Sequence, residues 1–93
     1  MVVSGAKVIF HIPYASSLKE KRQIRRSLVD KTKQKFNISI AEVGSQDTHQ
    51  ILTLGLAIVA ESHTHAEEQL EEAIRFLEGN TDAELLSVEY VEA

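Results

Sequence analysis

Two hydrophobic periods alternate along this 93-residue chain, and their order predicts an α+β fold. Four stretches place apolar residues at every second position, as half-buried strands do, and two place them at the helical period. The order is strand, helix, strand, strand, helix, strand, which is typical of a split βαβ unit. We therefore expect a ferredoxin-like βαββαβ sandwich, with a four-stranded antiparallel sheet and both helices on one face. Right-handed crossovers would place the first and third strands in the middle.

The composition predicts one domain over residues 1–93, since a chain of this length supports a single modest core. Hydrophobic residues make up 43% and charged residues 26%, which are ordinary values for a globular protein. The chain has no cysteine, which excludes a disulfide scaffold, a thiolate zinc site and a cysteine nucleophile. No signal-peptide pattern and no apolar run of about 18 residues is present, so we expect a cytoplasmic protein without membrane contact.

The first strand is expected over residues 2–12, where Pro13 ends it because proline cannot donate a ladder hydrogen bond. The first helix is expected over residues 17–36. It begins with a predicted capping box, in which Ser17 accepts from the Glu20 amide and the Glu20 side chain returns to the Ser17 amide.

Lys21 and Arg25 lie within or beside the apolar stripe of this helix. We expect their methylene stems to lie on the sheet edge and their charges to point outward. The apolar stripe itself consists of Leu18, Ile24, Leu28, Val29 and Phe36.

The predicted first helix holds eight of the ten Lys and Arg residues, although the formal net charge of the chain is -4. Four of them project within roughly 60° of one another on the side opposite the apolar stripe. Clustered cations attract phosphate backbones, so we predict nucleic-acid binding by this group. The alternative is a merely solvated outer face, since Lys and Arg are good helix formers. The predicted nucleic-acid-binding residues are Lys19, Arg22, Arg26 and Lys33.

The rest of the chain repeats the same two patterns. The second helix is expected to start with a capping box from Thr64 to Glu67 and to end near Gly79 and Asn80. The remaining strands are expected over residues 36–43, 51–60 and 85–91.

One face of the predicted sheet carries no helix. When the larger apolar residues are assigned to the core, this open face is small and apolar, and it includes Leu85 of the last strand. Apolar patches of roughly several hundred Å² usually mark an interface, so we predict a homodimer through this face. The alternative is a protein–protein adaptor that works through the same face and binds no nucleic acid. The predicted interface residues are Ile9, Ala41, Val43, Ala57, Val59 and Val91.

No pattern in the sequence predicts catalysis, a metal or a cofactor. His63 and His65 are two residues apart and would not share a helical face, and no cysteine could complete a zinc site. A glycine-rich phosphate loop is missing, and the third strand has no aromatic residue on which a base could stack. We therefore expect a binding module with no catalytic residue, no metal and no cofactor, and not an enzyme.

Three segments resemble the YlxP-like bacterial family: Ser17-Leu18-Lys19-Glu20-Lys21-Arg22, Phe36-Asn37-Ile38-Ser39-Ile40-Ala41-Glu42-Val43 and Gln46-Asp47. The resemblance implies a small cytosolic domain with a ferredoxin-like fold and no established catalytic residue. Gene neighbours of this family act in translation initiation and ribosome maturation, which implies ribosomal RNA or a ribosomal particle as the partner. Ser45 and His49 depart from the pattern that we expect of the family, which has a histidine and an aromatic residue at these positions.

Overall fold

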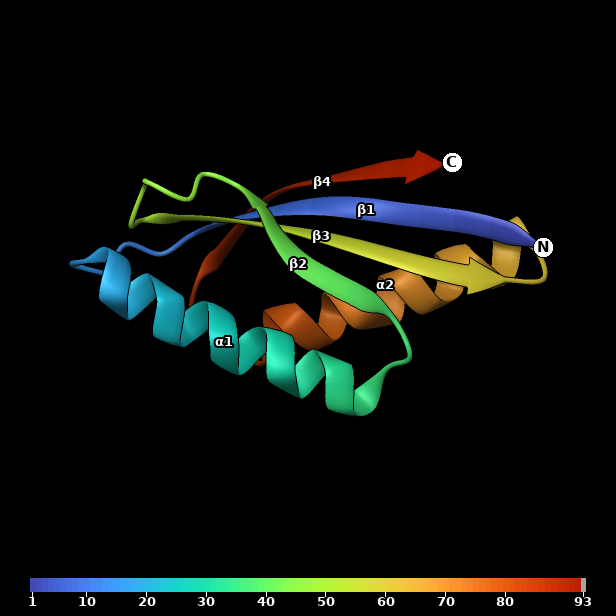
Figure 1. Cartoon of the computed structure of the whole chain (residues 1–93), viewed down its shortest axis with the longest axis horizontal. Helices are drawn as coiled ribbons and strands as arrows, with labels where there is room; N and C mark the ends of the chain where they lie inside the picture. The colour runs from blue at the N-terminus through green and yellow to red at the C-terminus, as the bar shows by residue number, and fades with distance from the viewer. Residues whose placement is uncertain (93) are drawn as a thin grey trace.

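The computed structural model describes residues 1–92 and has the predicted βαββαβ order. The sheet order is β2-β3-β1-β4, and all neighbouring strands are antiparallel. Both helices cover one face of the sheet (Figure 1). The ferredoxin-like fold class and the central position of the first and third strands are therefore confirmed. The elements are β1 (Val2–His11), α1 (Leu18–Lys35), β2 (Ser39–Gly44), β3 (Ile51–Ala60), α2 (His63–Gly79) and β4 (Glu84–Glu92).

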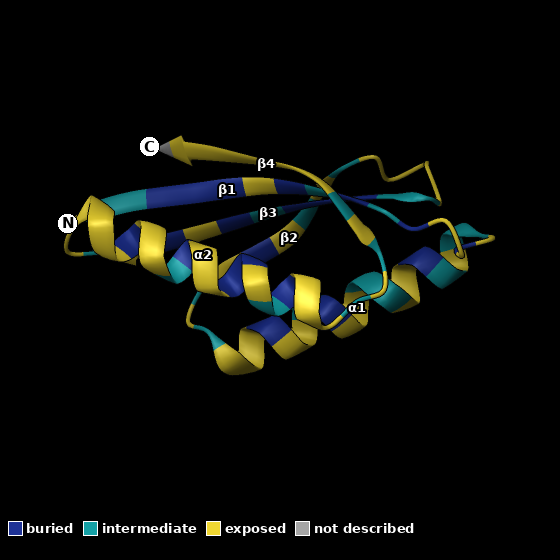
Figure 2. Ribbon diagram, turned by 180° about the vertical axis from the view of Figure 1, so that it is seen from behind, coloured by how far each residue is buried: buried dark blue, intermediate teal, exposed yellow. Residues whose placement is uncertain are grey.

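The core lies between the two central strands and the inner sides of the helices (Figure 2). Strict alternation in β3 turns its larger apolar residues inward and its smaller ones to the open face, as predicted. The α2 helix packs against β1 and β3, and α1 packs against β2. The fully buried core residues are Val8, Phe10, Ile12, Leu52, Leu54, Ala66, Leu70, Ala73 and Leu77.

The caps of both helices differ in detail from the predicted capping boxes. Ser17 accepts from the Glu20 amide at 3.1 Å, as expected. The Glu20 carboxylate, however, accepts hydrogen bonds from Ser16 instead of Ser17, from its amide at 3.0 Å and from its hydroxyl at 2.8 Å. In α2 the cap is Ser62, whose hydroxyl accepts from the His65 amide at 3.2 Å. Ser62 has the extended backbone that a cap requires, so the helix starts before Thr64 and the box predicted there is wrong.

A β-bulge in β4 changes which side chains face the core. Ile9 pairs with Ser87 but Phe10 pairs with Leu85, so Leu86 is an extra residue in the strand. The extra residue reverses the alternation, and Leu85 packs against the core instead of lying on the open face. The prediction for Leu85 was therefore wrong.

Candidate functional site

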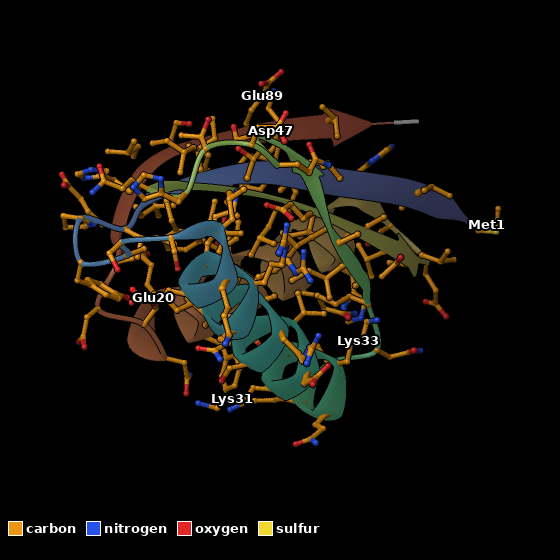
Figure 3. All side chains as sticks on the ribbon, turned by 60° about the vertical axis from the view of Figure 1, so that its left-hand side comes forward. Met1, Glu20, Lys31, Lys33, Asp47 and Glu89 are labelled. Atoms are coloured by element: carbon orange, nitrogen blue, oxygen red, sulfur yellow. The ribbon has the colours of Figure 1, made fainter. Side chains whose placement is uncertain are left out.

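The predicted basic residues Lys19, Arg22, Arg26 and Lys33 are all exposed on α1. None of the four forms an ion pair with another residue in the part of the chain that the structure describes. Figure 3 shows Lys31 and Lys33 on the surface of the same helix. The structure thus brings the predicted residues together on one side of a single rigid element, with their charges available to an external anion.

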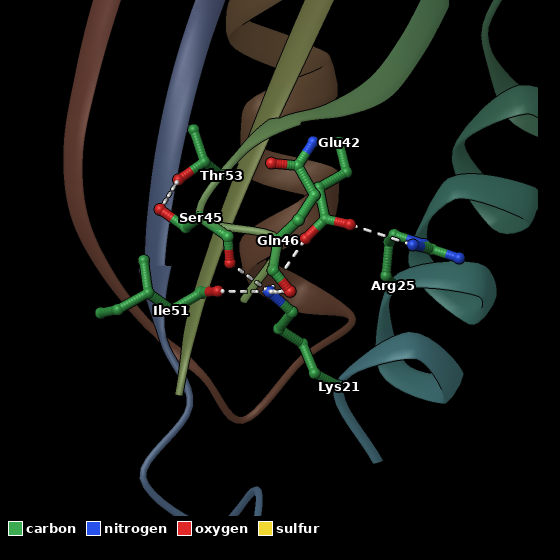
Figure 4. Close-up of polar contacts among 7 residues, drawn as sticks. All are labelled: Lys21, Arg25, Glu42, Ser45, Gln46, Ile51 and Thr53. Atoms are coloured by element: carbon green, nitrogen blue, oxygen red, sulfur yellow. Dashed lines mark hydrogen bonds and ion pairs between the residues drawn. The ribbon is translucent and has the colours of Figure 1, made fainter. Parts of the chain in front are cut away.

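Lys21 and Arg25 do not point outward, contrary to the prediction. The Lys21 side chain is 1% exposed, and its Nζ donates to the carbonyl oxygens of Ser45 at 2.6 Å and Ile51 at 3.1 Å (Figure 4). The same Nζ lies 3.0 Å from Oε2 of Glu42, and an Nη of Arg25 donates to Oε1 at 2.9 Å. The prediction failed because it did not place a carboxylate on the inner face of β2.

The Glu42 carboxylate is charged in this buried position. Its side chain is 7% exposed, and burial alone would raise its pKa. The contacts with Lys21 and Arg25 outweigh burial, so that the pKa of Glu42 lies below its ordinary value of 4.5. Two cations thus share one ionised carboxylate, and neither of them is part of the exposed basic group on α1.

The β2–β3 loop closes around the Lys21 ammonium. Ser45 has a φ of 57°, in the left-handed region, and its hydroxyl lies 3.1 Å from that of Thr53. In this backbone conformation the Ser45 carbonyl oxygen accepts from Lys21 Nζ at 2.6 Å. The Ser45 carbonyl therefore links the loop to α1 through Lys21.

Sequence reasoning missed the Lys21–Glu42 pair, although the positions of both residues in the hydrophobic pattern indicated that they face the core. Lys21 is seven residues before Leu28 and eleven before Thr32, which places all three on the buried side of α1. Glu42 is two residues after Ile40 and shares its inner face. Two opposite charges at core-facing positions of neighbouring elements predict a buried ion pair.

The open sheet face brings the predicted interface residues together. Val43, Val59 and Val91 are 53%, 62% and 50% exposed, Ala41 and Ala57 are also exposed, and Ile9 is half-buried. A shallow hollow of about 410 Å³ crosses the face, lined among others by Ala41, Gly55, Ala57 and Val91. Lys7 and Glu89 form an ion pair of 3.6 Å within this largely apolar surface.

The ionisable residues outside these surfaces form no recognisable reaction centre. Within residues 1–92, no group of three or more His, Asp or Glu is placed to hold a metal ion, and no helix is long and apolar enough to cross a membrane. His11 lies 3.9 Å from Glu84 at one end of the sheet. The amide and then the hydroxyl of Ser16 hold the pKa of Glu20 below its usual value. That the protein is not an enzyme stays a prediction.

Fold and surfaces together define a small α+β domain of the ferredoxin-like type, with one strongly basic helix and one uncovered sheet face. A family model described as "Protein of unknown function (DUF503)" matches residues 3–90. "Uncharacterized protein YlxP" from Bacillus subtilis (strain 168) is 37% identical over 70 residues, which cover 75% of this chain and 76% of that protein. The chain belongs to this YlxP-like family of unknown function, and the resemblance seen in the sequence is confirmed.

Proposed function

We propose that this protein is a non-enzymatic RNA-binding module that contacts structured ribosomal RNA, alone or in a ribosomal particle, through α1. One observation carries the proposal: four exposed cations share one side of this helix and have no anionic partner among the described residues. Lys21 and Arg25 are both paired with the Glu42 carboxylate, so the four unpaired charges form a defined group rather than a diffuse excess.

The geometry of α1 suits a phosphate backbone. Lys19 and Lys33 are fourteen residues apart, which corresponds to about 21 Å along a helix axis. Lys31, Lys33 and Lys35 lie at the C-terminal end, where the helix dipole favours cations. In α2, five glutamates accompany a single arginine, so that helix repels phosphates and RNA would approach from the α1 side.

The expected mode of recognition is contact with phosphates and RNA shape. Proteins that read RNA on a sheet stack bases on aromatic residues of the central strands. The open faces of β1 and β3 carry no Phe, Tyr or Trp in the described structure, and His11 lies at the very end of β1, beside Glu84. We therefore expect weak sequence preference and a strong dependence on salt.

The test is the binding of a labelled, structured ribosomal RNA fragment, measured by fluorescence anisotropy over a salt series. With about four phosphate contacts, the affinity should fall roughly a hundredfold between about 50 and 200 mM salt. Arg22→Glu/Arg26→Glu should bind at least about tenfold more weakly, with a salt slope shallower by about two.

Arg75→Glu in α2 serves as the control, compared with Arg22→Glu alone. Both substitutions change the net charge equally, and both arginines are exposed. The proposal requires that only the substitution in α1 weakens binding. Equally weak binding of wild type and the double variant at moderate salt would exclude this function.

A second candidate function is a protein contact through the open sheet face, with another protein or a second copy of this chain. The exposure of Val43, Val59 and Val91 around a shallow hollow favours it. Ala57→Trp would fill this hollow and should abolish self-association or partner binding, as measured by sedimentation velocity. Charge reversals on α1 should leave that association unchanged, which separates this function from RNA binding.

A further inference from the structure

The outer edge of β4 is uncovered. β4 is the last strand of the sheet, and the structure places no strand on its outer side within residues 1–92. Its nine residues correspond to roughly 30 Å of extended chain. Leu86 to Val91 are all exposed (Figure 2). Such an edge presents unpaired backbone N–H and C=O groups that can pair with another strand.

A second observation concerns the helix side of the same strand. Val88 and Tyr90 lie opposite Val8 and Ala6, which are buried, yet they are 36% and 49% exposed. Leu86, on the same side by alternation, is 51% exposed. The α2 helix packs against β1 and β3, which leaves this apolar row of β4 half-covered.

We propose that a second copy of this chain pairs antiparallel with the outer edge of β4, about a two-fold axis at Val88. Pairing at this axis would join the two sheets into one of eight strands. It satisfies both observations at once, because the edge gains hydrogen bonds and the apolar row gains a partner. This inference does not depend on RNA binding.

The sequence of β4 is self-complementary in this register. With Val88 opposite itself, Leu86 lies opposite the partner subunit's Tyr90, so the helix side of the junction is apolar from Leu86 to Tyr90. The register places two acidic residues opposite each other only at the two ends of the paired segment, where Glu84 lies opposite the partner subunit's Glu92. On the open face, Ser87 lies opposite the partner subunit's Glu89 and can donate to its carboxylate. Centring the pair at Glu89 would oppose two carboxylates, and centring it at Ser87 would place Tyr90 against the partner subunit's Glu84.

Pairing at the β4 edge also accounts for the exposed apolar row of β4, which stacking two copies on their open faces would not. Stacked faces would leave Leu86, Val88 and Tyr90 exposed, since these residues lie on the other side of the sheet. In the edge dimer the open faces of both protomers remain free and form one continuous surface. The basic α1 helices, which pack against β2, lie toward the outer ends of such a dimer.

Single-cysteine crosslinking tests the register directly, because the chain has no cysteine of its own. In Val88→Cys the two thiols meet at the axis, and mild oxidation should convert the protein to a covalent dimer. Val91→Cys is the matched control on the same strand. In the proposed register its two copies are six residues apart, roughly 20 Å, which exceeds the limit of about 7 Å between the Cα atoms of a disulfide.

A charge test on the reversible dimer accompanies the crosslinking. Sedimentation equilibrium is measured at protein concentrations of roughly 1 to 100 µM, a range that includes the dimer dissociation constants expected for a small interface. Val88→Lys should abolish association, because two cations meet at the axis. The same substitution at Val59, which is exposed on the open face, should leave it intact. A mixture of Val88→Lys and Val88→Glu should regain association.

Three results would overturn the proposal. The first is a wild-type protein that stays monomeric over the whole concentration series. The same result is expected if the partner at this edge is a different protein, and it would overturn the proposal of a second copy. The second is dissociation of the dimer by Val59→Lys but not by Val88→Lys, which would place the second copy on the open face. The third is a crosslink in Val91→Cys in place of Val88→Cys, which would exclude the register.

Discussion

Lys21 of α1 and Glu42 of β2 form an ion pair of 3.0 Å between side chains that are 1% and 7% exposed. The same ammonium donates to the carbonyl oxygens of Ser45 and Gln46 in the β2–β3 loop and of Ile51 at the start of β3. Arg25 donates to the other oxygen of the Glu42 carboxylate. These contacts connect α1, the edge strand β2 and the β2–β3 loop in the protein interior. The position of α1, and of the cations on its outer side, depends on these contacts.

Removal of the Lys21 charge should destabilise the fold. Lys21→Met keeps an unbranched side chain, one atom shorter, but leaves the buried Glu42 carboxylate with Arg25 alone, and three carbonyl groups lose their donor. We expect the free energy of unfolding to fall by about 3 kcal/mol, measured by urea denaturation. Lys19→Met, at an exposed position of the same helix, should change it by less than about 0.5 kcal/mol. Similar values for both variants would contradict the role given to Lys21.

The Lys21–Glu42 contact should also appear as an interaction energy in a double-mutant cycle. Glu42→Leu leaves the Lys21 ammonium buried without its carboxylate, whereas Lys21→Met/Glu42→Leu removes both charges. The double variant should therefore be less destabilised than the sum of the single variants, by about 1 to 3 kcal/mol. Additive losses in urea denaturation would show that the two side chains do not interact.

Acid should weaken the fold through Glu42. Its pKa is lower in the folded chain than the ordinary value of 4.5, so this carboxyl stabilises the fold fully above about pH 4.5 and less as the pH falls through the folded pKa. Chemical unfolding measured between about pH 3 and 7 should show this decline, with a shallower slope in Glu42→Gln. Glu20 also has a lowered pKa and accounts for part of the remaining slope, which Glu20→Gln should reduce. An unchanged slope in Glu42→Gln would contradict the assignment.

The element order and the central strands of the fold were predictable, because burial of one face imposes a regular spacing of apolar residues on each helix and strand. In β3, Leu52, Leu54, Leu56 and Ile58 all face the core, as simple alternation requires. The prediction failed where the backbone departs from the period. Leu85 and Leu86 are adjacent leucines, and no residue in that segment signals which of them is the extra one in the bulge.

The candidate surfaces were predictable to different degrees. Exposure of Lys19, Arg22, Arg26 and Lys33 follows from the helical period alone, because they lie opposite the apolar stripe. The helical period places Lys21 on the buried side of α1, but its ion pair also requires Glu42 on the inner face of β2, a strand that is distant in sequence. The half-exposed row on β4 depends on how far α2 extends over the sheet, which periodicity does not define.

Two glycines of the sheet should respond differently to alanine. In Gly5→Ala the new Cβ would lie 2.7 Å from the carbonyl oxygen of Leu56, a backbone atom that cannot move without disturbing the β1–β3 pair. We expect a loss of about 2 kcal/mol in the free energy of unfolding. In Gly55→Ala the nearest atom, at 2.8 Å, is a methyl group of the exposed Val43, which can rotate away. That variant should lose less than about 1 kcal/mol, and equal losses in urea denaturation would contradict this difference.

Tyr90 should ionise at an unusually high pH. Burial comes first in raising its pKa above 10.0, followed by the negative charges of Glu71 and Glu67, while Arg75 acts in the opposite sense. In Tyr14→Phe, Tyr90 is the single tyrosine, so its ionisation can be followed by ultraviolet absorbance. Glu67→Gln/Glu71→Gln should move the titration back toward 10.0.

The same titration also reports on the proposed edge dimer. Pairing at β4 would cover Tyr90 with the partner subunit's Leu86 and remove more water from its hydroxyl. The pKa of Tyr90 should therefore be higher at protein concentrations that favour the dimer than at low concentration, because burial disfavours the phenolate. In Val88→Glu, whose carboxylates stay charged in this pH range and should keep the protein monomeric, the titration should not depend on concentration. A concentration-independent titration in the otherwise wild-type background would mean that no second copy covers this side of β4.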